Sequence, residues 1–173
     1  TLTDIETFTL TVNAINDAPV LSDIGPQTIN EDEDTTILLS ASDVDIATNG
    51  QSLLYSATSS DESLVTVSVS SGDSTGSGSI TFDVQSNQNG SADITVTVTD
   101  DGTGTLTDIE TFTLYVNAIN DAPVLSYIGP ATIEVYAHTL PSLFGSDVDI
   151  ATNEQSLLYS ATSSAESLVT VSV

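Results

Sequence analysis

The sequence predicts an all-β chain built from tandem, seven-stranded Greek-key sandwiches. Three observations predict this fold. One long segment recurs along the chain, short runs within each copy alternate apolar and polar residues, and turn-forming residues separate those runs about every 8–14 residues. The apolar residues are mainly Val, Ile, Leu and Ala mixed with Thr and Ser, a mixture that suits half-buried strands.

The recurring segment is about as long as one whole domain. Residues 1–69 align without a gap with residues 105–173, and 54 of the 69 aligned positions are identical. The offset of 104 residues is too long for a solenoid unit and fits a complete domain. We therefore interpret the chain as part of an array of near-copies.

An Asn-Asp-Ala-Pro sequence occurs in both copies and marks the joint between domains. Proline fixes its own φ and keeps the preceding residue extended, as a short, stiff linker requires. Division at this joint predicts that residues 1–16 are the last strand of a preceding repeat, residues 17–120 are a complete sandwich, and residues 121–173 are the first half of a following repeat. That half lacks its last three strands, so we expect the native protein to continue past Val173.

Seven strands are expected within the complete repeat. In chain order they are Val20–Ile29, Thr36–Ala41, Ser52–Thr58, Thr66–Val69, Ser79–Val84, Ile94–Val98 and Thr111–Val116. The last four alternate clearly between apolar and polar residues, and the first three do so more weakly. Turn signals such as Asn49-Gly50 and Asn89-Gly90 separate them. No segment combines a helical period with caps, so no helix is expected.

The charge of the chain is entirely negative. It has 25 Asp and Glu residues and no Lys or Arg, which gives a formal net charge of −25. Binding to nucleic acid or to anionic membranes requires basic residues, so both classes of partner are excluded. No apolar run approaches the roughly 18 residues of a membrane-spanning helix, so direct membrane insertion is not expected. The chain has no Cys, which rules out disulfides and Cys-based metal sites.

Acidic residues crowd where neighbouring domains are expected to meet. If the strands alternate up and down, the loops of Asp43, Asp73 and Asp100 share one end of the repeat, and those of Glu31 and Asp61 share the other. Repeats stacked end to end would then collect one set of oxygen ligands at each joint: Glu31, Glu33, Asp61 or Glu62, Asn120, Asp121, Asp147 and Asp149. Because the chain lacks basic side chains, only water or bound cations can offset the repulsion among these acids, which makes the joint a candidate cation site. Hard oxygen ligands, about six to eight in number, suit Ca²⁺ better than Mg²⁺, which keeps more of its water.

Several motifs together carry a resemblance to a known family. They are Asn-Asp-Ala-Pro-Val, a Glu-rich segment after it, Asp-Val-Asp with Asn six residues after its first Asp, Leu-x-Tyr-Ser, and Val-Thr-Val-Thr-Asp. This combination resembles the cadherin repeat, and it is more closely similar to the bacterial cadherin-like, immunoglobulin-like tandem repeats of giant RTX-type surface adhesins. The resemblance covers the complete repeat and both fragments. It implies Ig/cadherin-like sandwiches in an extracellular protein, on the bacterial cell surface or secreted, whose joints bind Ca²⁺ and stiffen a long stalk.

The resemblance also implies which residues bind the metal. Carried over position by position, the implied ligands are Asn16, Asp17, Asn120 and Asp121 in the linkers, Asp43, Asp45, Asp147 and Asp149 in the Asp-x-Asp loops, Asp100 at the end of a strand, and the early Glu31. The sequence departs from the cadherin pattern at Ala14 and Ala118, where the linker would begin with Asp. It departs again at residues 87–89, which replace Leu-Asp-Arg-Glu. We therefore expect fewer ions at each joint than a cadherin binds.

The two copies differ at residues expected to bind metal. The acidic run Asn30–Asp34 becomes Glu134–His138 in the second copy, and Asp61 becomes Ala165. The Asp-x-Asp motif is kept. We therefore expect a calcium-binding joint before the second copy and a weakened one beyond it.

These patterns favour a structural extender, a calcium-rigidified stalk repeat whose partners are the neighbouring repeats of the same chain. An alternative is a homophilic or glycan-binding adhesion module that forms fibres or cell contacts. For the acids alone, a further alternative is a halophilic surface that serves hydration. An enzyme is not expected, because the complete repeat has no His for a Ser/His/Asp set and the chain has no Trp to line a glycan cleft.

Overall fold

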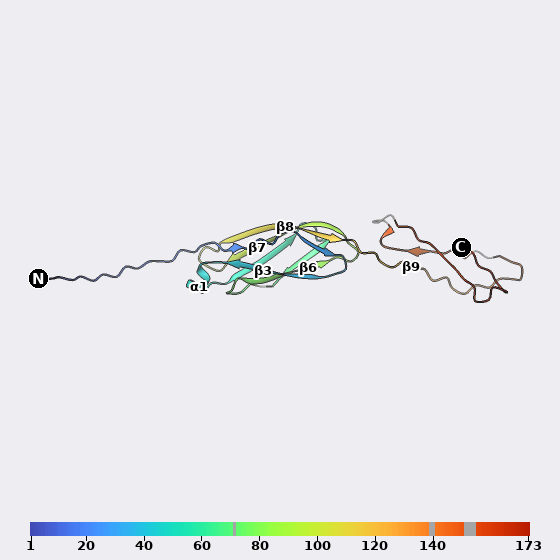
Figure 1. The fold of residues 1–173 in the computed structure, drawn as a ribbon, viewed down its shortest axis with the longest axis horizontal. Helices are drawn as coiled ribbons and strands as arrows, with labels where there is room; N and C mark the ends of the chain where they lie inside the picture. The colour runs from blue at the N-terminus through green and yellow to red at the C-terminus, as the bar shows by residue number, and fades with distance from the viewer. Residues whose placement is uncertain (71, 139–140, 151–154) are drawn as a thin grey trace. The chain divides into compact units, whose positions relative to one another are not determined.

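The computed structural model describes residues 1–70, 72–138, 141–150 and 155–173 (Figure 1). Strands make up nearly all of the regular structure, which confirms the all-β class. Among the residues in these ranges, no helix is long and apolar enough to cross a membrane.

The chain divides into two compact units, Thr1–Ala118 (unit 1) and Ile119–Val173 (unit 2). Unit 1 contains two four-stranded sheets. In spatial order, the first sheet consists of β1 (Val20–Leu21), β3 (Thr35–Ser42), β6 (Ser77–Val84) and β5 (Val65–Val69). The second consists of β2 (Gln27–Asn30), β8 (Thr107–Asn117), β7 (Gly90–Asp100) and β4 (Leu53–Ser59). Neighbouring strands are antiparallel except β2 and β8, which are parallel.

The first expected strand is divided in the structure, because the chain changes sheets between β1 and β2. Gly25, at φ 62°, supplies a left-handed bend between them. Two carboxylates of β8 hold the crossing segment, and the first is Asp108, whose Oδ2 accepts a hydrogen bond from Leu21 N at 2.8 Å. The second is Glu110, whose Oε1 accepts one from Ile24 N at 2.8 Å. Unit 1 therefore has eight strands among its described residues instead of the seven expected.

One short helix, α1 (Asp45–Asn49), lies in the loop after β3, so the expectation of no helix is wrong. Asp43 Oδ1 accepts a hydrogen bond from Asp45 N at 2.8 Å, which turns the chain into the helix. Gly50 follows the helix in the left-handed conformation, at φ 68°, and its N–H bonds to Ile46 O. Five residues are too few to produce a recognisable helical period, which is why the sequence pattern does not reveal this helix.

The core lies between the two sheets of unit 1. β7 directs Ile94, Val96 and Val98 inward, and all three are fully buried. Phe82 of β6 is also fully buried and packs edge-on against Phe112 of β8, with ring centroids 6.2 Å apart and an interplanar angle of 81°. The period of two in the sequence therefore corresponds to the inward face of each strand.

The strand directions gather the loops of unit 1 at two ends. β3 and β5 run opposite to β6, and β7 runs opposite to β4 and β8. One end, the linker pole, is made of residues 16–17, 43–52, 72–76 and 100–106. The other end, the far pole, is made of residues 31–34, 60–64 and 85–89. The predicted grouping of loops is confirmed by these registers and contacts.

Residues 1–15 form no strand and are exposed, although they nearly repeat the sequence around β8 (Figure 1). Residues 3–13 match Thr107–Asn117 at every position but one. β8 is hydrogen-bonded between β2 and β7, whereas no described strand pairs with residues 3–13. A strand without neighbours is not stable in water, so tertiary pairing decides which copy becomes a strand.

Unit 2 contains one short antiparallel pair among its described residues, β9 (Val124–Leu125) and β10 (Gly145–Ser146). Many of its large apolar side chains are exposed. Leu168 is 82% exposed, whereas its counterpart in unit 1, Leu64, is 6% exposed. The same sequence therefore packs into a core in unit 1 and remains open in unit 2.

Candidate metal site

The linker residues of unit 1 contact the loop after β3 at the linker pole. Asp17 N donates to Asp45 Oδ2 at 2.8 Å, and Asp45 N donates to Asp43 Oδ1 at 2.8 Å. Asn16 Nδ2 donates to Asp100 Oδ2 at 3.0 Å. Hydrogen bonds thus connect five of the ligands that the resemblance implies: Asn16 to Asp100, and Asp17, Asp43 and Asp45 to one another.

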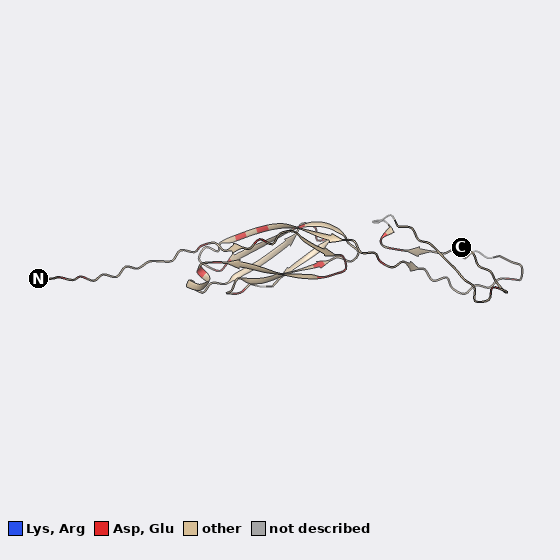
Figure 2. Cartoon of the chain, in the orientation of Figure 1, with Lys and Arg blue, Asp and Glu red and all other residues tan. Residues whose placement is uncertain are grey.

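Asp43 and Asp45 differ in how their oxygens are satisfied. Asp45 is buried, and its oxygens accept hydrogen bonds from Asp17 N and from Asn49 Nδ2, the latter at 2.9 Å. Asp43 uses Oδ1 for Asp45 N, but its Oδ2 is buried and has no hydrogen-bond partner within the described part of the chain. A buried carboxylate oxygen without a donor is costly. This chain has no Lys or Arg to pair with it (Figure 2).

A surface hollow of about 370 Å³ lies beside Asp43. It is lined by Asp17, Ala18, Val20, Ser42, Asp43 and Val44. Its volume corresponds to roughly a dozen water molecules, so a cation and part of its hydration shell have room there. Carboxylate, carbonyl and water oxygens are the ligands that Ca²⁺ takes. The donor set and the orphaned oxygen therefore fit a calcium ion.

Asp100 has an environment unlike that of Asp43. It is 2% exposed, and its Oδ1 accepts hydrogen bonds from Gly102 N at 3.0 Å and from Leu106 N at 3.2 Å. Its Oδ2 accepts one from Asn16 Nδ2. These donors satisfy the carboxylate and fold the loop between β7 and β8. Asp100 therefore anchors the linker through Asn16.

Across the ranges that the structure describes, no three His, Cys, Asp or Glu side chains are gathered closely enough to hold a metal ion. At the linker pole, the two carboxylates of the Asp-x-Asp loop are instead accompanied by amide side chains. A cation there would need neutral oxygens from amides, main chain or water in addition to Asp43 and Asp45.

Gln51 belongs to this cluster although no acidic pattern indicates it. It is 7% exposed, and its Nε2 donates to Asn16 Oδ1 at 2.6 Å. The sequence does not reveal Gln51 as a site residue, because a neutral amide does not contribute to the charge pattern. The one available signal is that Gln follows the Asp-x-Asp loop in both copies, which is equally true of most of its neighbours.

The same hydrogen-bond pattern recurs in unit 2. Asp121 N donates to Asp149 Oδ2 at 2.7 Å, and Asp149 N donates to Asp147 Oδ1 at 2.9 Å. Gln155 Nε2 donates to Asn120 Oδ1 at 2.5 Å. Asp149 is 4% exposed, although most of the described residues of unit 2 are exposed. The structure therefore brings together the four ligands expected in unit 2 in the arrangement found in unit 1.

The four ligands expected at the far pole have more varied surroundings. Glu31 is 3% exposed, whereas Glu33, Asp61 and Glu62 are exposed. Asp61 Oδ1 accepts hydrogen bonds from Ser63 Oγ and Ser63 N, and these bonds hold the pKa of Asp61 below its ordinary value. Asp61 thus shapes the loop in which it lies.

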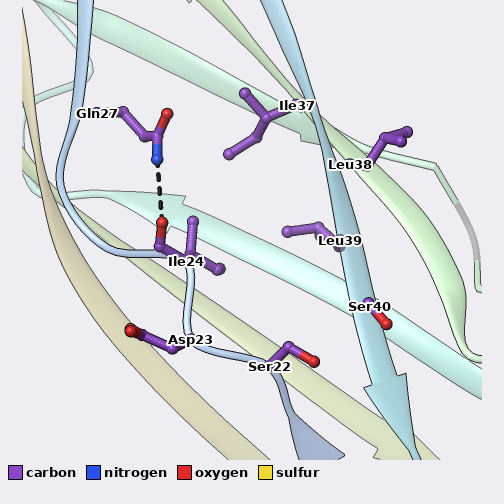
Figure 3. A pocket seen from close by; sticks show the side chains of 8 residues that line it. All are labelled: Ser22, Asp23, Ile24, Gln27, Ile37, Leu38, Leu39 and Ser40. Atoms are coloured by element: carbon purple, nitrogen blue, oxygen red, sulfur yellow. Dashed lines mark hydrogen bonds between the residues drawn. The ribbon is translucent and has the colours of Figure 1, made fainter.

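A second hollow, of about 280 Å³, lies between the segment that crosses from β1 to β2 and strand β3 (Figure 3). Ile24, Ile37 and Leu39 line it, and Gln27 Nε2 donates to Ile24 O at 3.0 Å. Asp23 is the one titratable residue in its lining. The hollow therefore offers no pair of groups for acid–base chemistry or metal binding.

Asp73, also at the linker pole, lies in a turn rich in hydrogen-bond donors. Its Oδ1 accepts from Thr75 Oγ1 at 2.6 Å, from Thr75 N at 2.7 Å and from Ser77 N at 3.2 Å. The Thr75 hydroxyl and these amides hold the pKa of Asp73 below its ordinary value of 3.8.

We expect this turn to contribute stability that is lost in acid. Because the folded-state pKa of Asp73 is lowered, the contribution is fully present above the unfolded value and disappears as the pH falls through the folded value. Asp73→Asn should therefore flatten the acid limb of the stability curve, measured by urea unfolding between about pH 2 and pH 6. Thr75→Ala, which removes the hydroxyl donor, should flatten it as well. Superimposable acid limbs in the wild type and both variants would contradict this role.

A family model described as a bacterial Ig domain matches residues 16–114, which is more than half of the chain. The matched range begins at the linker of unit 1 and ends within β8. A comparison with curated proteins found no match.

Several solved structures resemble the chain at low identity. Surface layer protein SbsC, domains 1–6, is 19% identical with a TM-score of 0.45, over 69% of this chain and 15% of that chain. The protocadherin GammaB4 extracellular domain is 22% identical with a TM-score of 0.46, over 76% of this chain and 23% of that chain. Mouse clustered PcdhgC3 EC1-3 is 17% identical with a TM-score of 0.49, over 79% of this chain and 47% of that chain. The chain thus spans less than half the length of each of these structures.

Proposed function

The chain belongs to the bacterial Ig domain family, and we propose that it is a calcium-rigidified extender repeat in the stalk of an extracellular bacterial adhesin or surface fibre. The observation that carries the calcium part is Asp43 Oδ2, which is buried beside a hollow and lacks a hydrogen-bond partner among the described residues. The chain has no Lys or Arg to neutralise it. A divalent cation from the medium would supply the positive charge.

In this proposal the chain is a segment of a tandem array of Greek-key sandwiches. Residues 17–120 form a complete repeat, residues 1–16 supply the last strand of the preceding one, and residues 121–173 begin the next. The family match over one copy supports this division. The repeated hydrogen bond from the linker to the Asp-x-Asp loop, at Asp17 and again at Asp121, supports it as well.

The proposed mechanism is electrostatic. Without cations, the carboxylates of the linker and the Asp-x-Asp loop repel one another, and they repel the equivalents of Glu31 and Glu33 on a neighbouring repeat. Asp43 and Asp45 would hold the ion, and a shared Ca²⁺ would fix the linker against its own domain. The hydrogen bond between Asn16 and Asp100 would hold the linker with or without the ion. A string of domains would thereby become a stiffer rod.

Calcium titration of the full chain tests this proposal. Extracellular modules bind Ca²⁺ with a Kd of about 10⁻⁴–10⁻³ M, so such a site fills outside the cell. At about 10 mM Ca²⁺, the relation RT ln(1 + [Ca²⁺]/Kd) then gives a gain of roughly 1.4–2.7 kcal/mol in the free energy of unfolding. EDTA should reverse this gain, and an equal concentration of Mg²⁺ should produce less of it. An unchanged melting temperature with and without EDTA, together with no heat of calcium binding, would refute the proposal.

One observation favours the second candidate, a homophilic or glycan-binding adhesion module. The outer face of the β2-β8-β7-β4 sheet is rich in threonine and carries exposed Leu54, Ile109 and Tyr115. Its strands contain four acids, and only Asp93 alternates onto this face. A nearly uncharged face on so acidic a chain would permit contact with another copy or with a sugar hydroxyl array. Concentration-dependent sedimentation that Tyr115→Asp abolishes would support this candidate over a passive spacer.

A further inference from the structure

A chain of amide hydrogen bonds connects the linker of unit 1 to the body of the sandwich. Gln51 Nε2 donates to Asn16 Oδ1 at 2.6 Å, and Asn16 Nδ2 donates to Asp100 Oδ2 at 3.0 Å. Gln51 and Asp100 are both more than nine-tenths buried, with exposed fractions of 7% and 2%. The Gln51 side chain is thus directed at the linker from inside the fold.

Asp100 fixes which atom donates in each hydrogen bond of this series. A carboxylate only accepts hydrogen bonds, so Asn16 must present its NH₂ group to Asp100 and its oxygen to Gln51. Gln51 must then present its NH₂ group to Asn16. Its own oxygen, Oε1, is left over, and it is buried without a hydrogen-bond partner among the residues that the structure describes. Turning either amide around would place two acceptors face to face.

The amide pair also lies close against Gly102. A Cβ on Gly102 would lie 2.0 Å from Asn16 Oδ1 and 2.6 Å from Gln51 Nε2. The backbone at Gly102 therefore closes over both side chains. An added ligand or a water molecule would satisfy the leftover oxygen of Gln51.

Two buried oxygens without a hydrogen-bond partner thus occur at the linker pole of unit 1, Asp43 Oδ2 and Gln51 Oε1. Hydrogen bonds join both residues to the linker. Gln51 bonds to Asn16, and Asp43 is joined to Asp17 through Asp45. The glutamine contact is repeated in unit 2, between Gln155 and Asn120. One oxygen is anionic and the other is neutral, a combination that a calcium ion accepts.

We propose that Gln51 is a neutral oxygen ligand of the linker-pole cation and the residue that makes the site prefer Ca²⁺ to Mg²⁺. This inference rests on the proposed calcium site. Ca²⁺ takes about six to eight oxygen ligands, whereas Mg²⁺ is satisfied by a few carboxylates and retained water. A neutral amide oxygen raises the ligand number without adding another negative charge to a chain of net charge −25.

The test is isothermal titration of the full chain with Ca²⁺ and, separately, with Mg²⁺. All proteins carry Asp149→Ala, which silences the second copy of the cluster, so that the titration reports unit 1. Gln51→Met keeps the volume of the side chain and removes its oxygen and its donor. We expect the Kd for Ca²⁺ to rise about 10-fold or more, and the Kd for Mg²⁺ to change by less than about 3-fold. The matched control, Gln27→Met, changes a glutamine at the strand crossing and should leave both values unaltered.

Gln51→Glu distinguishes ligation from folding. It keeps a side-chain oxygen but cannot donate to Asn16, so its Kd for Ca²⁺ should stay within about 3-fold of the parent value. A loss as large as that of Gln51→Met would assign Gln51 a role in holding Asn16 only, and would overturn ligation. Unchanged Ca²⁺ affinity in Gln51→Met, or equal losses for both ions, would also overturn the inference while the proposed function stood. A parent protein that binds no Ca²⁺ would instead refute the proposed function itself.

Discussion

Replacing Asp45 with alanine is expected to abolish the calcium-dependent gain in the stability of unit 1 and to weaken calcium binding at the linker pole by about 10–100-fold. Asp45 is 5% exposed, and its Oδ2 holds the linker through Asp17 N. Its Oδ1 holds α1 through Asn49 Nδ2. The substitution therefore removes a proposed ligand and releases two segments beside it. The calcium-free protein should also lose about 1.5–3 kcal/mol, the usual contribution of a hydrogen bond to a charged group.

The measurement is a urea unfolding curve with and without EDTA, together with a calcium titration. Asp34→Ala is the matched control, because it also removes one acid but lies exposed at the far pole. It should retain the calcium-dependent gain. Retention of the gain in Asp45→Ala would place the ion away from the Asp-x-Asp loop.

The strands are predictable from sequence because their signal is local. Inward residues such as Ile94, Val96 and Val98 alternate with polar ones, and the buried face follows from that alternation alone. The change of sheet between β1 and β2 is different. It depends on Asp108 and Glu110, more than 80 residues away, which accept hydrogen bonds from the crossing segment. No local pattern carries that information.

The candidate site likewise contains residues that the sequence predicts and features that it does not. Acids repeated at equal positions in both copies predict that Asp17, Asp43 and Asp45 belong together, and the structure places them in contact. The sequence does not distinguish the orphaned oxygen of Asp43 from the fully bonded carboxylate of Asp100, because that difference arises from backbone donors around each. It also misses Gln51, since an uncharged amide gains its importance only from the partner it meets in space.

Phe112 and Phe8 provide the strongest contrast between local sequence and packing. Both lie within Glu-Thr-Phe-Thr-Leu. Phe112 is 5% exposed and packs against Phe82, whereas Phe8 is 86% exposed. Phe112→Ala should therefore lower the free energy of unfolding by about 3–5 kcal/mol, through lost burial and the cavity left behind. Phe8→Ala should change it by less than about 0.5 kcal/mol, as expected of a surface substitution.

Urea unfolding of the wild type and the two variants measures both effects. Strand propensity and sequence neighbours are the same at the two positions, so the difference between the variants isolates tertiary packing. A loss of several kcal/mol from Phe8→Ala would mean that residues 3–13 compete with β8 for its place between β2 and β7. A small loss of unfolding free energy from Phe112→Ala would mean that β8 does not close the core. The loop that leads into β8, which forms part of the linker pole, would then not be positioned as described.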